Sequence, residues 1–126
     1  MLAILIAAAL AQPDVLAVLA DTEAHGNRVE LLQRPAGVTT AAFVDALLEE
    51  AGAAGWERTD REVSVEEVQL RIVAARNPGS GLLLYIPVGA DGRAVCRVLK
   101  VKPVRTPEEE RRRIDRFCVK GLASSR

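Results

Sequence analysis

The chain is poor in aromatic residues, histidine and cysteine. Its 126 residues include two phenylalanines, one tryptophan, one tyrosine, one histidine and two cysteines. Because aromatic side chains are so few, a core has to be built from valine, leucine, isoleucine and alanine. One histidine and two cysteines at these spacings do not form a zinc site. Phosphate-binding glycine loops and nucleophile motifs are also missing, so the sequence predicts neither a catalytic residue nor a cofactor.

The chain also has no net charge, but its two halves differ. Residues 1–60 carry nine acidic and three basic side chains, whereas residues 61–126 carry fourteen basic and eight acidic ones. A net charge of zero argues against nonspecific binding of nucleic acid by the whole molecule. The opposite signs predict either an acidic and a basic face or two halves that pair with each other. Frequent alanine, valine and arginine are typical of a high-GC bacterial genome.

The longest hydrophobic run is short and stands at the N-terminus. Residues 2–11 are ten apolar residues without a charge, and they end in Ala9-Leu10-Ala11 before Gln12. This pattern is typical of a signal peptide, so we expect residues 1–11 to be removed and residues 12–126 to form one periplasmic or extracellular domain. No basic residue precedes the run, which leaves a packed N-terminal strand or helix and a short anchor as alternatives. A bilayer span needs about 20 apolar residues, so no membrane span is expected.

Periodicity predicts one helix in the first half of the chain, over residues 40–54. Thr39 is a suitable N-cap for it. Apolar side chains fall at helical spacing on one face: Phe43, Val44, Leu47, Leu48 and Ala51. Residues 28–33 predict a short strand. The apolar run at residues 15–20 is too short for periodicity to decide between helix and strand.

The second half predicts a three-stranded antiparallel meander. Its strands are expected at residues 68–72, 82–88 and 93–101, where apolar residues alternate with polar ones or form short runs between turn signals. The middle segment is apolar on both faces, which suits a strand covered on both sides. Ser64 and Glu67 have the spacing of a capping box, so a helix starting near Ser64 stays open as an alternative.

A second helix is predicted over residues 107–120. Thr106 and Glu109 form a capping box at its start, and Pro107 occupies the first helical position. Taken together, the elements predict an α+β domain. Its small antiparallel sheet of three or four strands is packed on one face by the two helices, and a signal-like segment precedes it.

Cys96 and Cys118 are expected to face the core between the third strand of the meander and the last helix. In an oxidising compartment such a pair favours a disulfide, and the alternative is two buried reduced thiols. His25 lies in a polar loop before Gly26. An exposed turn histidine explains it better than a general base or a metal ligand does, because nothing nearby in the sequence supplies a nucleophile or a second ligand.

Basic side chains crowd the third strand and the last helix, and they are the candidates for binding an anionic partner. The alternative is a solvated face, because glutamates four residues before two of the arginines partly neutralise the helix. The candidates are Arg97, Lys100, Lys102, Arg112, Arg113 and Arg116.

The function that these features favour is a non-enzymatic binding or interaction domain of the cell envelope, secreted or periplasmic. Its partner would be an anionic envelope component or an acidic protein. One alternative is a small enzyme or enzyme inhibitor with a site assembled from scattered residues such as His25 and nearby acids. The other is a cytosolic regulatory domain that associates with nucleic acid or other anions through its basic half.

Overall fold

Eight elements of secondary structure occupy the part of the chain that the structure, a computed structural model, describes: residues 13–20, 26–89, 94–100 and 106–124. In chain order they are β1 (Asp14–Leu19), β2 (Asn27–Gln33), α2 (Thr40–Glu50), β3 (Glu57–Val65), β4 (Val68–Arg76), β5 (Gly81–Pro87), β6 (Ala94–Lys100) and α3 (Glu108–Ser124). The strands form one antiparallel sheet in the order β1-β2-β6-β5-β4-β3. The predicted signal peptide, residues 1–11, lies outside the described residues.

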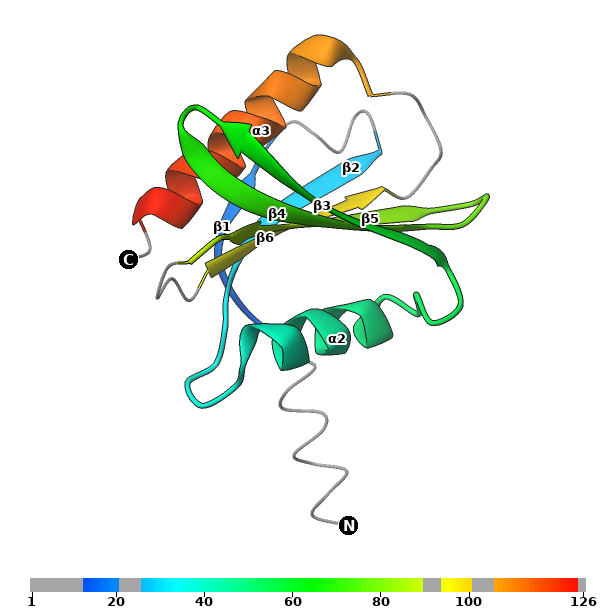
Figure 1. The fold of residues 1–126 in the computed structure, drawn as a ribbon. Helices are drawn as coiled ribbons and strands as arrows, with labels where there is room; N and C mark the ends of the chain where they lie inside the picture. Colours follow the sequence, from blue (N-terminus) through cyan, green and yellow to red (C-terminus); the bar gives the residue numbers. More distant parts are fainter. Residues whose placement is uncertain (1–12, 21–25, 90–93, 101–105, 125–126) are drawn as a thin grey trace.

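The predicted architecture of three or four strands with both helices on one face is wrong. The sheet has six strands, and α2 and α3 lie on its opposite faces (Figure 1). The undecided run at residues 15–20 is the edge strand β1, which pairs with β2. The central strands β5 and β6 bury side chains on both faces, and a strand of this kind needs a covering layer on each side.

The strand that the sequence did not reveal is β3. Five of its nine residues are charged and most of its side chains are exposed, so it shows no apolar alternation. All nine residues nevertheless pair with β4, because an edge strand needs backbone partners on one side only. The capping-box helix near Ser64 is also wrong. Glu66 and Glu67 both have positive φ angles, 49° and 68°, and they form the two-residue turn between β3 and β4.

Each face of the sheet has its own apolar core. On the α2 face, Phe43, Val44 and Leu47 of the helix pack on the strands; the strand residues are Leu32, Val73, Leu82, Leu84, Ile86 and Val95. On the α3 face, the helix contributes Ile114, Cys118, Val119 and Leu122; the sheet contributes Val29, Leu31, Leu70, Ile72, Tyr85, Ala94, Cys96 and Val98. The predicted meander is present as the neighbouring strands β4, β5 and β6.

Both predicted helices are present with changed ends. The Thr39 side chain accepts a hydrogen bond from the backbone N of Ala42 at 3.1 Å, and α2 ends at Glu50 before Gly52, which has a φ of 68°. By contrast, α3 runs through Gly121. A Cβ at this position would meet Leu31 Cδ2 at 2.8 Å, so Gly121 permits close packing of α3 on β2 instead of ending the helix.

Candidate binding cleft

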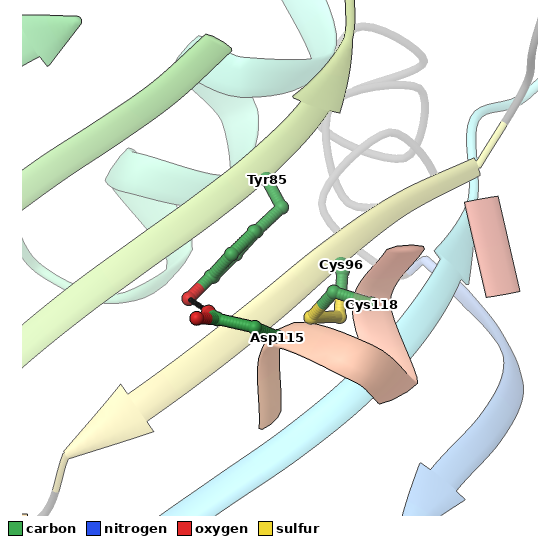
Figure 2. The surroundings of a disulfide bond; sticks show 4 residues. All are labelled: Tyr85, Cys96, Asp115 and Cys118. Carbon is green, nitrogen blue, oxygen red and sulfur yellow. Dashed lines mark hydrogen bonds between the residues drawn. A yellow bond between two sulfur atoms is a disulfide. The ribbon is translucent and has the colours of Figure 1, made fainter. Parts of the chain in front are cut away.

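A disulfide anchors α3 to the middle of the sheet. Cys96 of β6 and Cys118 of α3 are bonded, their Cα atoms lie 5.4 Å apart, and both side chains are fully buried (Figure 2). The bond predicted from the sequence is therefore present. A disulfide of this kind is typical of proteins in oxidising compartments outside the cytoplasm. In the described part of the chain, no helix is long and apolar enough to cross a membrane.

A cavity of about 340 Å³ lies between α3 and the half of the sheet next to β3; we call it the α3 cleft. The helix packs mainly on β6, β2, β1 and β5, which leaves room over the remaining strands. The floor of the cleft is apolar. Its lining residues are Arg61, Ile72, Leu83, Tyr85, Val98, Lys100, Thr106, Arg111 and Ile114.

Among the described residues that line the α3 cleft, three are cations and none is a carboxylate. Arg61 comes from β3, Lys100 from β6 and Arg111 from α3. None of the three forms an ion pair with a carboxylate among the described residues. Most other arginines of the described chain do have such a partner: Arg28, Arg58, Arg71, Arg76, Arg97, Arg112 and Arg116. Unpaired positive charge is thus concentrated at this cleft.

Tyr85 forms part of the cleft floor and is held in its neutral form. Its hydroxyl donates a hydrogen bond to Asp115 Oδ1 at 2.7 Å (Figure 2), and its side chain is only 5% exposed. Burial and this hydrogen bond raise the pKa of Tyr85 above its ordinary value, while the positive charges of Arg111 and Arg61 act in the opposite direction. Tyr85 therefore supplies a neutral surface, and its bond occupies the Asp115 carboxylate.

Two further depressions adjoin the α3 cleft. One, of about 250 Å³, shares Leu83 and Lys100 with it and extends to the β4–β5 turn; we call it the hairpin groove. Its other lining residues are Glu57, Thr59, Ala74, Ala75, Arg76, Gly81 and Leu82. The other depression, of about 390 Å³, shares Thr106 and Arg111 with the cleft and is otherwise lined by Glu108, Arg112 and Asp115. The depression at the start of α3 is lined by polar side chains, whereas the hairpin groove has small and apolar residues between charged ones.

The six predicted anion-binding residues do not lie on one surface. Lys100 lines the α3 cleft, but Arg97 points to the opposite face, because the two are three residues apart on β6. Arg112 pairs with Glu108 and Arg116 with Glu66, both in exposed positions, and Arg113 is exposed on the same helix. Lys102 and His25 lie outside the described residues.

Arg97 is instead part of a buried ionic cluster on the α2 face. Its Nη2 atom donates to Glu30 Oε1 at 2.9 Å, and its Nη1 atom donates to Glu50 Oε2 at 3.2 Å. Arg28 Nε lies 3.5 Å from the same Glu30 oxygen. Arg97 is 7% exposed and Glu30 only 2%, so this arginine neutralises the buried Glu30 carboxylate and is not available to a ligand.

Sequence reasoning did not select two of the three cleft cations, Arg61 and Arg111. Arg61 lies on the strand that the sequence did not reveal, where it pairs with Ile72 and shares its face of the sheet. A signal for Arg111 was available. It precedes Ile114 by three residues and Cys118 by seven, which places it on the inward stripe of α3.

The cleft provides cations, the Thr106 hydroxyl and apolar surface, which are groups that bind an anion and exclude water from it. Among the described residues, no cluster of three or more histidine, cysteine, aspartate or glutamate side chains could hold a metal ion. Comparison of the chain with family models, with curated proteins and with solved structures found no match.

Proposed function

We propose that this protein is a periplasmic or extracellular binding domain of the cell envelope whose α3 cleft holds a small anionic ligand. The observation that carries the proposal is the convergence of Arg61, Lys100 and Arg111 on one cavity without carboxylate partners among the described residues. The location is supported by the buried disulfide and by the apolar residues 2–11.

Electrostatics favours an anion at this place. The three positive charges come from three different elements and line one cavity, where like charges repel one another. An anion between them replaces repulsion by attraction. At about 4 Å from one cation, at an effective dielectric constant near 20, a unit anion gains about 4 kcal/mol before its desolvation is counted. The apolar floor strengthens this attraction because it excludes water from one side of the anion.

The test is binding of 8-anilinonaphthalene-1-sulfonate, an anion with an apolar body, followed by its fluorescence at low and high salt. We expect Arg61→Gln and Arg111→Gln each to weaken binding about tenfold or more, as expected for the loss of a charge-assisted hydrogen bond. Binding by the unmodified protein should also weaken with salt, because the Debye length falls from about 10 Å at 0.1 M to about 3 Å at 1 M.

The matched control is Lys120→Gln. Lys120 is exposed on α3, and its substitution changes the net charge by the same amount without touching the cleft. It should leave the affinity for the dye unchanged. Equal losses in the control and in the two arginine variants would mean that only net charge matters. Such a result, or no salt-dependent binding by the unmodified protein, would overturn the proposed function.

A further inference from the structure

We propose that the ligand of the α3 cleft is a single-chain amphiphile. Its anionic head group, a carboxylate or a phosphate, lies among Arg61, Lys100 and Arg111, and its apolar chain lies in the hairpin groove. This inference rests on the proposed function and names its ligand class. It starts from the continuity of the two cavities, which share Leu83 and Lys100.

Lys100 stands where the cleft and the groove meet. It pairs with Gly81 across β5 and β6, and a Cβ at Gly81 would lie 3.8 Å from Lys100 Cβ and 4.0 Å from Lys100 Cδ. The aliphatic stem of the lysine therefore covers the glycine, and its methylenes add apolar surface beside the groove. One residue thus offers a charge to a head group and a hydrocarbon stem to a chain.

Small side chains make the groove deep enough for a chain. Along the α3 side of β4, Ile72 is followed by Ala74 and then by Arg76, and the partners on β5 are Tyr85, Leu83 and Gly81. Ala74 occupies little volume where a larger residue would fill the space, and Gly81 leaves room for the Lys100 stem. Arg76 lies four positions after Ile72, which corresponds to about 13 Å of strand. An extended chain can lie over this distance before it reaches the charged Arg76.

An ion pair closes the groove on the side of β3 and β4. Arg76 Nη2 lies 3.8 Å from Glu57 Oε1, so these two side chains neutralise each other where the groove ends. Arg61 pairs with Ile72 at one end of this strip, and Lys100 pairs with Gly81 at the level of Arg76, near the end that the ion pair closes. An amphiphile would use both the cations and the apolar floor, whereas an inorganic anion would leave the apolar floor unused.

The experiment is calorimetric titration of the full chain, with its disulfide intact, with straight-chain probes below their micelle-forming concentrations. The probes are hexanoate, octanoate, decanoate, decyl phosphate and decanol. We expect the affinity to rise two- to fourfold with each added methylene, since full burial of one methylene corresponds to about fourfold. Decanoate and decyl phosphate should both bind, and decanol should bind at least tenfold more weakly because it has no charge for the three cations.

The groove itself is tested by Ala74→Leu, which fills it from β4. This variant should bind hexanoate as the unmodified protein does and should lose the gain in affinity from hexanoate to decanoate. The matched control is Gln69→Leu, an exposed position on β4 whose side chain lies on the other face of the sheet. It should bind all five probes as the unmodified protein does, which excludes a general effect of an added leucine.

Failures of the two proposals are distinguishable. If the dye and hexanoate bind through Arg61 and Arg111 but affinity does not change with chain length, the amphiphile is wrong and a small-anion site remains. A chain-length effect that survives Ala74→Leu also overturns the inference, because the chain then lies elsewhere. Binding to phosphatidylglycerol vesicles without binding of any monomeric probe would overturn it in favour of a lipid surface. If no anionic probe binds, the proposed function fails as well.

Discussion

The two faces of the sheet differ in whether an arginine near the core has a carboxylate partner. On the α2 face, Arg97 is buried and forms ion pairs with Glu30 and Glu50. On the α3 face, Arg61 and Arg111 line a cleft without a carboxylate partner among the described residues. A buried charge with an ion-pair partner stabilises the folded structure, whereas unpaired charges that line a cavity are available to bind a ligand. The candidate site is therefore identified by basic residues without a carboxylate partner among the described residues, and not by the number of basic residues.

The difference arises from where each helix places its carboxylates. Glu50, at the end of α2, reaches Arg97. Three of the four carboxylates of α3 are engaged with groups other than the cleft cations. Glu110 accepts a hydrogen bond from Asn27 Nδ2 at 2.9 Å, and Asp115 accepts one from Tyr85. Glu108 pairs with its helical neighbour Arg112. Among the described residues, the three cations of the α3 cleft therefore have no carboxylate partner, although α3 is rich in acidic residues.

The largest effect is expected for Arg97→Met on the α2 face. Removing this guanidinium leaves Glu30 buried with only the partial compensation of Arg28, and breaking a buried pair in this way costs about 3–5 kcal/mol. Urea unfolding with the disulfide intact measures the loss. Glu50→Gln, at a half-exposed position, should cost less than half as much. A loss below about 1 kcal/mol for Arg97→Met would contradict the structural role of this cluster.

The next effect concerns the disulfide, which belongs to the α3 face alone. Its two cysteines are 22 residues apart, and in the chain-entropy model the double variant Cys96→Ala, Cys118→Ala loses about 3 kcal/mol. Hydrogen exchange should then show earlier opening of α3, while α2 keeps its protection relative to the rest of the chain. Equal loss of protection in both helices would mean that the two faces unfold as one unit and would weaken the comparison.

A smaller effect is expected at Tyr85, the only tyrosine of the chain. Its pKa is raised in the folded state, so the unfolded chain loses this proton first as the pH rises. The contribution of Tyr85 to the free energy of unfolding is therefore fully present below about pH 10, the ordinary pKa of tyrosine, and it declines as the pH rises further. Absorbance of tyrosinate should appear in folded protein only at higher pH than in urea-unfolded protein. Tyr85→Phe should cost about 1 kcal/mol at neutral pH and should remove this alkaline decline.

The smallest effect is expected for Arg111→Gln measured without a ligand. Since Arg111 is exposed, shares the cleft with two other cations and has no carboxylate partner among the described residues, its loss should change the free energy of unfolding by no more than about 0.5 kcal/mol. Relief of repulsion makes a slight gain the expected sign. Thermal unfolding of this variant beside Arg97→Met compares the two faces directly. A loss above about 1 kcal/mol would show that Arg111 supports the fold.

Local signals explain which parts of the fold were predicted. Both helices were predicted from periodic apolar residues and N-terminal capping residues. The strands β4 to β6 were predicted from short apolar stretches between turn residues. The disulfide followed from placing Cys96 on a strand face and Cys118 on a helix stripe. The strand β3 was not predicted because its many charged side chains give no apolar alternation. It is held in the sheet by backbone pairing with β4. Arg61 was missed for the same reason.

The sequence determines features that depend on neighbouring residues. These are helix caps, turns, the helical periodicity of apolar residues and the alternation of side chains along a strand. The sequence therefore specified that Arg97 and Lys100 point to opposite faces of β6. It did not specify which of them would be neutralised. Arg97 is separated by 67 residues from Glu30 and by 47 from Glu50, and these side chains meet only when β2, β6 and α2 pack together. Charge pairing depends on distance in space, so folding made Arg97 structural and left Lys100 at the cleft.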